Sequence, residues 1–330
     1  MRKITVIGAG MSGLAFATRM AEHGYAVTLF EKSRGVSGRM STRQLAEGYC
    51  DHGAQYITAS DPDFQRQIQQ WQAEGLVDIW EPRLLTFGAR TDGKHPAELG
   101  PITRYVGVPK MTAPSVALAG RLKVAFSTRI VRIEPSTNGW MLFDDAGDTG
   151  TEAGYLVFAI PPEQILPILG SATPTWVGTV QATTMSPCWT VMAVTTGSDK
   201  AACDAAFVNE GPLAWIANNA TKPGRSTAAI WTLHATADWS RKHVNAAPDE
   251  VATALSAAFE KITGQHVINT VTHRWLYAKA DAPGANRYLW DPTQKLGAIG
   301  DWLCQGNVEG AWMSGALCAD HLLNSELETT

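Results

Sequence analysis

Long apolar runs and an excess of basic residues are both missing from this sequence. No stretch of about 18 uninterrupted apolar residues occurs along the 330-residue chain, so we expect no membrane-spanning helix and no membrane partner. Lysine and arginine number 27 against 31 aspartates and glutamates, which gives a formal net charge of −4. Because phosphate binding requires a basic face, this balance argues against nucleic acid as a partner.

Cysteine is also scarce, and it is not arranged in pairs. The five cysteines are scattered without a C-x-x-C motif: Cys50, Cys188, Cys203, Cys304 and Cys318. Such usage argues against a disulfide framework and a zinc site, and it indicates reduced thiols in a cytoplasmic protein. No Ser-His-Asp triad, metal-ligand cluster or carboxylate pair stands out either, so we predict no metal and assign no catalytic side chain.

A glycine pattern between two predicted strands is present near the beginning of the chain. Residues 3–7 have the composition of a buried strand and precede Gly8-Ala9-Gly10-Met11-Ser12-Gly13, a G-x-G-x-x-G motif. A helical pattern then runs to Gly24, and a second strand over residues 26–30 ends at Glu31. This β-α-β unit with its terminal acid predicts dinucleotide binding, whereas a glycine-rich turn in an unrelated α/β unit is the alternative interpretation.

Each part of the glycine pattern has a chemical reason. The first glycine makes the tight turn, the second lets the main chain approach a pyrophosphate, and the third allows helix and strand to pack closely. The helix N-terminus then faces the phosphates, and Glu31 accepts hydrogen bonds from a ribose diol. The predicted cofactor contacts of this segment are Gly8, Gly10, Met11, Ser12, Gly13 and Glu31.

A second glycine-rich stretch, which is also basic, follows Glu31. A nicotinamide cofactor has no need of it, whereas the longer FAD requires further hydrogen-bond donors. The predicted contacts here are Lys32, Gly38, Arg39 and Met40, with Arg39 placed to pair with a pyrophosphate. A solvated basic loop is the alternative interpretation.

The far end of the chain carries a third block. A short apolar strand ends in Gly300-Asp301, and Val308-Glu309-Gly310 opens a helix rich in small residues. Asp301 suits a ribityl hydroxyl, and the helix N-terminus suits the flavin pyrimidine, where negative charge develops on reduction. A simple C-terminal amphipathic helix is the alternative.

Together these three blocks resemble the flavin-dependent amine oxidase superfamily. A closer resemblance, to its compact renalase branch, rests on Asp51-His52-Gly53-Ala54-Gln55-Tyr56, on His273-Arg274-Trp275 and on Gly300-Asp301. The resemblance implies FAD as the cofactor, with Gln55, Tyr56 and Ile130 as further contacts. The sequence around Cys304 does not resemble the covalent-flavin motif of the superfamily, so the FAD is expected to be noncovalent.

The predicted fold class is α/β. At about 150 residues per domain, the length predicts two domains. The resemblance implies that one is a Rossmann-type FAD-binding domain and the other a β-rich substrate domain, as in amine oxidases and p-hydroxybenzoate hydroxylase. Since the FAD motifs lie at both ends of the chain, the FAD-binding domain is expected to be discontinuous, over residues 1–58, 110–165 and 279–330. The substrate domain is expected over residues 59–109 and 166–278. Strand-like runs prevail from residue 166 to 278, and nine of the twelve tryptophans follow residue 170.

The resemblance also implies the residues that contact substrate: Tyr56, Asn219, His234 and Trp275. Asn219 follows a predicted strand, where its amide can bond a carboxamide, and Trp275 offers a stacking face. The alternatives are a turn-shaping asparagine, a satisfied histidine at a strand end and a core tryptophan.

The activity implied by the resemblance is that of an FAD-dependent oxidase. Members of the renalase branch oxidise isomeric dihydronicotinamide dinucleotides, 2- or 6-dihydro-NAD(P), to NAD(P)+. The hydride passes to flavin N5, and O2 is reduced to H2O2, so a small-molecule dinucleotide and O2 are the expected partners. The alternatives are a flavin amine oxidase or desaturase acting on a small amine or apolar substrate, and a non-catalytic flavin-binding redox protein.

Overall fold

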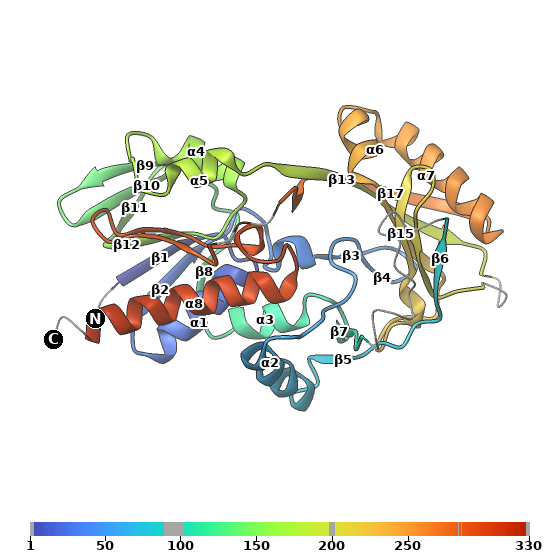
Figure 1. The fold of residues 1–330 in the computed structure, drawn as a ribbon, viewed down its shortest axis with the longest axis horizontal. Coiled ribbons are helices and arrows are strands. Elements are labelled where there is room, and N and C mark those ends of the chain that lie inside the picture. Colours follow the sequence, from blue (N-terminus) through green and yellow to red (C-terminus); the bar gives the residue numbers. More distant parts are fainter. Residues whose placement is uncertain (1–2, 89–101, 198–201, 283, 285, 328–330) are drawn as a thin grey trace. The chain divides into compact units, whose positions relative to one another are not determined.

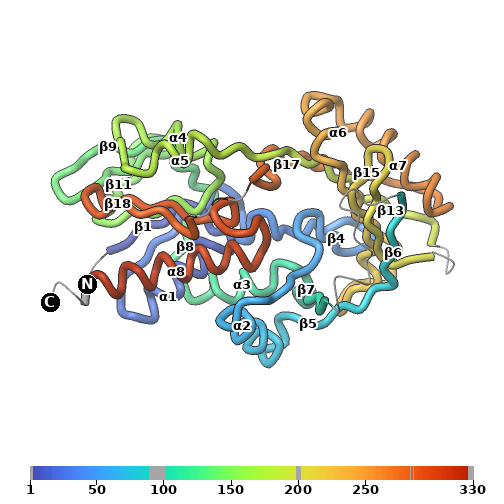
Figure 2. The backbone as a smooth tube through the Cα atoms, viewed as in Figure 1, coloured from blue at the N-terminus to red at the C-terminus, as the bar shows by residue number. Residues whose placement is uncertain are grey.

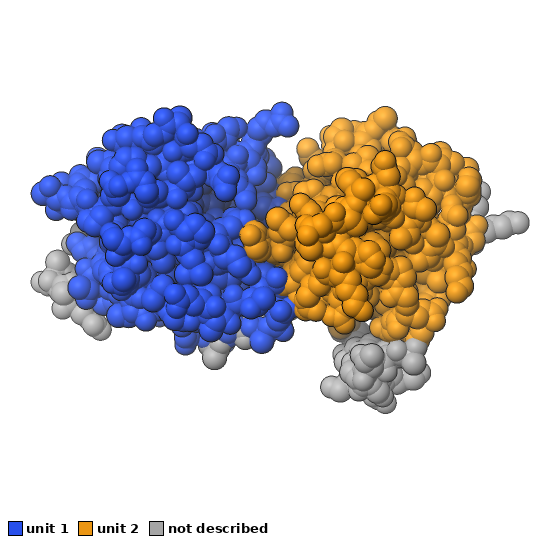
Figure 3. Space-filling model, turned by 90° about the horizontal axis from the view of Figure 1, so that it is seen from above, with its two compact units in different colours: residues 1–39, 114–185, 279–330 blue, residues 40–113, 186–278 orange. Residues whose placement is uncertain are grey.

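The computed structural model describes residues 3–88, 102–197, 202–282, 284 and 286–327. The chain divides into two compact units, which Figure 3 shows in two colours. Unit 1 comprises residues 1–39, 114–185 and 279–330, and unit 2 comprises residues 40–113 and 186–278. Each unit therefore gathers segments that are far apart in the sequence.

Unit 1 is built on a six-stranded sheet in the order β18-β19-β12-β1-β2-β8. Figure 1 labels β1, β2, β8 and β12 of this sheet. β1 lies between β2 and β12 and is parallel to both, with Val6 opposite Leu29 and Val157. Its apolar side chains are buried, as expected for a central parallel strand. The strands are β1 (Lys3–Ile7), β2 (Ala26–Phe30), β8 (Lys123–Ala125), β12 (Tyr155–Phe158), β18 (Leu289–Asp291) and β19 (Leu296–Ala298).

Two helices of unit 1, α1 (Met11–Glu22) and α8 (Val308–Leu327), lie side by side (Figures 1 and 2). A Cβ on Gly315 of α8 would lie 2.1 Å from the carbonyl oxygen of Ser12, so a glycine is required where the two helices meet. None of the described helices combines the length and apolar character needed to cross a bilayer.

The remaining elements of unit 1 flank this sheet in the sequence. They are β9 (Ile130–Ser136), β10 (Gly139–Asp144), β11 (Gly147–Ala153), α4 (Pro162–Leu169), α5 (Val177–Ala182) and η4 (Asp301–Leu303). Two further elements cross the unit boundary: η1 (Gly38–Met40), whose last residue belongs to unit 2, and α3 (Ala113–Ala119), whose first residue belongs to unit 2. β9, β10 and β11 form a three-stranded antiparallel sheet.

Unit 2 contains a second six-stranded sheet, in the order β17-β13-β16-β15-β14-β6. Its strands are β6 (Leu84–Phe87), β13 (Met185–Thr195), β14 (Ala205–Val208), β15 (Leu213–Asn218), β16 (Ile230–Ala235) and β17 (Val267–Ala280). The helix α7 (Pro248–Thr263) covers this sheet with Val251, Leu255 and Phe259, which repeat every fourth residue and are completely buried.

Shorter elements complete unit 2. They are β3 (Thr42–Gln44), β4 (Tyr49–Asp51), α2 (Pro62–Ala73), β5 (Val77–Ile79), β7 (Tyr105–Gly107), η3 (Asn219–Thr221) and α6 (Ala237–Lys242). β3 pairs with β4, and β5 pairs with β7, both antiparallel.

The predicted fold class is confirmed, with a Rossmann-type unit and a second, β-rich unit. The unit boundaries differ from the expected ones at residues 40–58, 110–113 and 166–185. Cys50 of β4 packs with Met192 and Ile230 of the second sheet, so the β3–β4 hairpin belongs to unit 2. Glu163 of α4 accepts a hydrogen bond from the Met185 N–H at 2.8 Å, so the chain stays in unit 1 as far as β13.

Candidate functional site

The turn between β1 and α1 requires glycine at two positions and leaves space at a third. Gly8 has a φ of +105°, and a Cβ there would lie 2.6 Å from the carbonyl oxygen of Ala159. A Cβ on Gly13 would lie 2.2 Å from the Gly8 carbonyl oxygen, so α1 packs directly on the turn. A Cβ on Gly10, the N-cap of α1, would meet no described atom within 4 Å. A helix N-terminus with this open approach fits the pyrophosphate of a dinucleotide.

Glu31 closes this turn from the end of β2. Its Oε2 accepts the Ala9 N–H at 2.9 Å, its Oε1 accepts the Ser33 N–H at 2.8 Å, and the residue is 7% exposed. Each carboxylate oxygen has a second lone pair, so Glu31 can hold the turn and also accept a ribose hydroxyl. The neighbouring Lys32 donates to Gln164 Oε1 at 3.3 Å, and burial lowers the pKa of its ammonium.

Arg39 and Asp301, which are 262 residues apart in the sequence, form a two-pronged ion pair in unit 1. Arg39 Nη1 and Nη2 donate to the two carboxylate oxygens of Asp301, at 3.0 and 2.5 Å. This fork geometry is among the most directional that side chains make. The sequence assigns the two residues to different parts of FAD, whereas the structure shows that each orients the other.

The start of α8 is fixed against the loop before it. The Gly310 N–H donates to Asn307 Oδ1 at 2.7 Å, and a Cβ on Gly310 would lie 1.7 Å from the Cys304 carbonyl oxygen. The Gly300 N–H donates to Ser314 Oγ at 2.9 Å, which ties the end of β19 to the same helix. These contacts give the helix N-terminus a defined place in unit 1.

The structure gathers most of the predicted cofactor residues in one unit. Unit 1 contains Gly8, Gly10, Met11, Ser12, Gly13, Glu31, Lys32, Gly38, Arg39, Ile130, Gly300, Asp301, Val308, Glu309 and Gly310. Met40, Gln55 and Tyr56 belong to unit 2.

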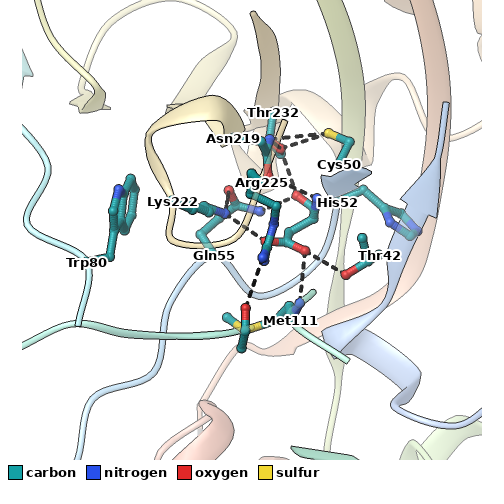
Figure 4. A network of polar contacts seen from close by, with 12 residues as sticks. Thr42, Cys50, His52, Gln55, Trp80, Met111, Asn219, Lys222, Arg225 and Thr232 are labelled. Carbon is teal, nitrogen blue, oxygen red and sulfur yellow. Dashed lines mark hydrogen bonds and ion pairs between the residues drawn. The ribbon is translucent and has the colours of Figure 1, made fainter. Parts of the chain in front are cut away.

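Asp51, at the end of β4, is the centre of a buried polar network in unit 2, and its partners Thr42, Met111, Lys222 and Arg225 are labelled in Figure 4. Its Oδ1 accepts Thr42 Oγ1 at 2.6 Å and the Met111 N–H at 3.2 Å. Its Oδ2 accepts Arg225 Nη2 at 2.7 Å and Lys222 Nζ at 3.2 Å. The side chains of Asp51, Lys222 and Arg225 are at most 1% exposed, so two cations share one carboxylate inside the unit.

These neighbours determine the ionisation of the network. Burial alone would raise the pKa of Asp51, but the charges of Lys222 and Arg225 lower it to about 2. Burial lowers the pKa of the Lys222 ammonium, and the charge of Asp51 opposes that shift. Asp51 therefore stays ionised throughout the physiological pH range.

Asn219, a predicted substrate contact, lies inside the same network (Figure 4). Its Oδ1 accepts the Asp51 N–H at 3.0 Å, and its Nδ2 donates to Thr232 Oγ1 at 2.9 Å and to the Ile230 carbonyl at 3.3 Å. The residue is 1% exposed. Both ends of its amide are therefore bonded to protein groups in the interior of unit 2.

Aromatic rings gather around His52, the residue after Asp51. The rings of His52 and Trp275 stack at 5.1 Å with 23° between their planes, and His273 stands edge-on at 4.9 Å from His52 and 4.2 Å from Trp275. The His52 carbonyl accepts His234 Nε2 at 3.1 Å and Trp275 Nε1 at 3.0 Å. We call His52, His234, His273 and Trp275 the ring cluster.

Two imidazoles of the ring cluster, those of His52 and His234, are held neutral. Burial lowers the pKa of His52 to about 3 and that of His234 to about 4. Burial, followed by the charge of Arg43, lowers the pKa of His273 as well. His52 Nδ1 is buried and has no hydrogen-bond partner among the described residues. An unpartnered buried nitrogen of this kind costs stability unless a water, an ion or a ligand satisfies it.

Tyr56, the fourth predicted substrate contact, belongs to a different group of side chains. Its ring lies 5.7 Å from Trp215, and the Arg104 guanidinium lies 5.3 Å from its centroid. The preceding Gln55 donates to the Asp51 carbonyl at 2.7 Å and accepts from Lys222 Nζ at 3.3 Å. Tyr56 is thus connected to the Asp51 network through its neighbour in the chain.

Sequence reasoning did not select several residues that the structure brings together: Asp51, His52, Lys222, Arg225 and His273. Asp51, His52 and His273 stand within motifs quoted above, so their position was an available signal, whereas no local pattern marks Lys222 and Arg225. Among the described residues, no group of three or more histidine, cysteine, aspartate or glutamate side chains is arranged to hold a metal ion.

Comparisons with known proteins match the N-terminal part of the chain in sequence. Residues 6–71 match the family model of an NAD(P)-binding Rossmann-like domain. An 85-residue stretch is 59% identical to 4,4'-diapophytoene desaturase (4,4'-diaponeurosporene-forming) of Staphylococcus aureus strain MRSA252. That stretch is 26% of this chain and 16% of the desaturase, so the match covers less than a fifth of that relative.

Solved structures resemble the whole chain in fold. A candidate protoporphyrinogen oxidase from Exiguobacterium sp. 255-15 has a TM-score of 0.76 at 12% identity, over 97% of this chain and 98% of that one. Putrescine oxidase bound to putrescine has a TM-score of 0.70 at 13% identity, over 98% and 99% of the two chains. The Rossmann-like segment is a dinucleotide-binding fold of the kind that flavoproteins use. The chain therefore has, over nearly its whole length, the fold of these two oxidases.

Proposed function

We propose that this protein is a renalase-like FAD-dependent oxidase of 2- or 6-dihydro-NAD(P), with the FAD bound noncovalently. When bound, FAD supplies the hydride acceptor at N5 and the route by which two electrons reach O2. One dihydronicotinamide, one O2 and one proton then give one NAD(P)+ and one H2O2. We further propose that the protein acts in the cytoplasm.

Unit 1 supports the cofactor part of this proposal. The N-terminus of α1 is open at Gly10 and suits the pyrophosphate, while Glu31 is buried at the end of β2 and suits the adenosine ribose. Arg39, held in a fixed direction by Asp301, adds a cation near the same segment of chain. These groups bind and orient; none of them transfers a proton in the proposed reaction.

The observation that carries the choice of substrate is the ring cluster in unit 2, in which Trp275 stacks on His52 and the imidazoles of His52 and His234 are uncharged. Burial lowers the pKa of His52 to about 3 and of His234 to about 4, so both are neutral at physiological pH. Oxidation converts a neutral dihydronicotinamide ring into a cation. The face of Trp275 attracts a cation and neutral imidazoles do not repel it, whereas protonated histidines would oppose its formation.

A flavin amine oxidase or desaturase is the second candidate, favoured by the desaturase match and the putrescine oxidase fold. A cationic amine would also be attracted to the face of Trp275. The Asp51 carboxylate is already neutralised by Lys222 and Arg225, so it is not available as a counter-ion for an amine. This favours the dihydronicotinamide as substrate.

Anaerobic reduction of the bound flavin by a panel of donors tests the proposal. We expect 2- or 6-dihydro-NAD(P) to bleach the flavin absorbance band and small amines to leave it unchanged. Bleaching by amines or apolar substrates alone would establish the second candidate, and no bleaching by any donor would indicate a non-catalytic flavoprotein. Acid precipitation of the same sample should leave the flavin in the supernatant; flavin that stays with the pellet would contradict noncovalent binding.

A further inference from the structure

The candidate substrate residues share a common attachment to the chain at residues 51–52. His234 and Trp275 donate to the His52 carbonyl, and Asn219 accepts the Asp51 N–H. Tyr56 follows Gln55, whose amide donates to the Asp51 carbonyl. The four residues come from separate segments of unit 2, yet each depends on this dipeptide directly or through one neighbour.

Asp51 itself is hydrogen-bonded through both its carboxylate and its main-chain carbonyl. Its two carboxylate oxygens accept four hydrogen bonds, from Thr42, Met111, Lys222 and Arg225 (Figure 4). Its carbonyl accepts the Thr232 hydroxyl at 2.7 Å in addition to the amide of Gln55, and the residue is completely buried. These bonds therefore fix the conformation of the main chain at residues 51–52 in the folded unit.

We propose that Asp51 is a positioning residue for the reaction, because its carboxylate fixes the main chain that carries the ring cluster. This inference rests on the proposed function only in that the ring cluster contacts the hydride donor. Asp51 itself touches no substrate in this role. Its effect passes through the His52 carbonyl, which sets the places of His234 and Trp275, and through the direction of the His52 ring.

The expected consequence is a selective loss of the hydride-transfer rate. Hydride transfer depends steeply on the place of the donor carbon, and a displacement of about 1 Å costs roughly a hundredfold. Reaction of the reduced protein with O2 requires no alignment of a large donor. A loss of positioning therefore slows reduction and spares reoxidation, whereas general destabilisation lowers the amount of folded, flavin-containing protein and leaves the rates per bound flavin unchanged.

Three variants test this: Asp51→Asn, Thr42→Val and the control Asp204→Asn. Asp51→Asn removes the charge at nearly constant shape, and Thr42→Val removes one of the four carboxylate bonds while leaving the charge. Asp204 also lies in unit 2 and accepts the side chain and the N–H of Arg83, at 2.6 and 2.8 Å, and in the described part of the chain its side chain makes no hydrogen bond to residues 51–52. Its substitution therefore weakens a similar ion pair away from the ring cluster.

Rates per bound flavin are measured in FAD-saturated protein by stopped flow, anaerobically for reduction and with O2 for reoxidation. We expect reduction to slow about a hundredfold in Asp51→Asn and about tenfold in Thr42→Val, the equivalent of one hydrogen bond. Reduction in Asp204→Asn should stay within about twofold of the parent protein, because this substitution leaves the donor's alignment unchanged. Reoxidation should stay within about twofold in all three variants, because the reaction with O2 does not depend on that alignment.

Equal slowing in Asp51→Asn and Asp204→Asn, or equal slowing of reduction and reoxidation, would overturn the proposal. If Asp51→Asn does not fold, Thr42→Val decides: unchanged reduction there overturns the proposal. The donor is whichever compound reduces the parent protein, so failure of dihydronicotinamides refutes the proposed function without touching this inference. The His52 ring protons, shifted by the stacked Trp275, provide a readout independent of activity; their resonances should move in Asp51→Asn and stay in place in Asp204→Asn.

Discussion

Replacement of His52 by phenylalanine tests whether burial holds the ring cluster neutral. His52 is 5% exposed, and burial lowers its pKa from the ordinary 6.5 to about 3. Because the folded-state pKa lies below the unfolded one, the unfolded chain binds more protons between these two values. The contribution of a neutral His52 to stability is therefore complete above about pH 6.5 and is lost progressively as the pH falls toward 3.

The magnitude follows from linkage, at about 1.4 kcal/mol per pH unit for one group. From pH 7 to 5.5, His52 should reduce the free energy of unfolding by about 1.3 kcal/mol, and the phenylalanine variant should lack this part. Phenylalanine keeps a ring against Trp275 and removes the unpartnered Nδ1. A difference in packing shifts stability equally at every pH, so the slope reports the titration of His52 alone.

Urea unfolding of the FAD-saturated protein at several pH values between 7.5 and 5.5 gives this slope. The parent protein should lose about 1.3 kcal/mol more than His52→Phe over the interval from pH 7 to 5.5. Ile268→Phe is the control, because Ile268 is 57% exposed and does not titrate; its slope should match that of the parent. Equal pH dependence in the parent and in His52→Phe would refute the argument that burial keeps this imidazole neutral.

Two further substitutions test unit 1. Glu31→Ala should weaken FAD binding by about 1.5–3 kcal/mol, the value of one charge-assisted hydrogen bond, as measured by flavin fluorescence during titration; unchanged affinity would place the ribose elsewhere. Gly310→Ala should lower the thermal unfolding midpoint by several degrees, because its Cβ would lie 1.7 Å from the Cys304 carbonyl oxygen. Gly178→Ala in α5, where a Cβ meets nothing within 4 Å, is the matched control and should leave the midpoint equal or higher; equal behaviour of the two variants would contradict the close approach at Gly310.

The β-α-β unit was predictable because its determinants are local. The strand over residues 3–7, the three glycines and Glu31 stand within about thirty positions of one another, and each has a steric or hydrogen-bonding reason that a short segment reveals. The buried helix face of α7 follows in the same way from its four-residue repeat.

The Asp51 network was not predictable in this way, because its partners come from distant segments. Asp51 bonds to Thr42 nine positions away, to Met111 sixty away and to Arg225 one hundred and seventy-four away. Nothing in the segment around Asn219 distinguishes an exposed amide from one that faces a buried main chain. The unit boundary at residue 40 was missed for a related reason, since the β3–β4 hairpin contributes Cys50 to the core of the second unit.

The division of the chain has a consequence for the order of events during synthesis. Unit 2 is complete once residue 278 has been made, whereas unit 1 still lacks β18, β19 and α8 at that point. Until the segment after residue 278 has emerged from the ribosome, β12 lacks its neighbour β19 and α1 lacks its neighbour α8. The Arg39–Asp301 pair forms only then, so this part of the dinucleotide-binding unit is completed after unit 2 has been translated.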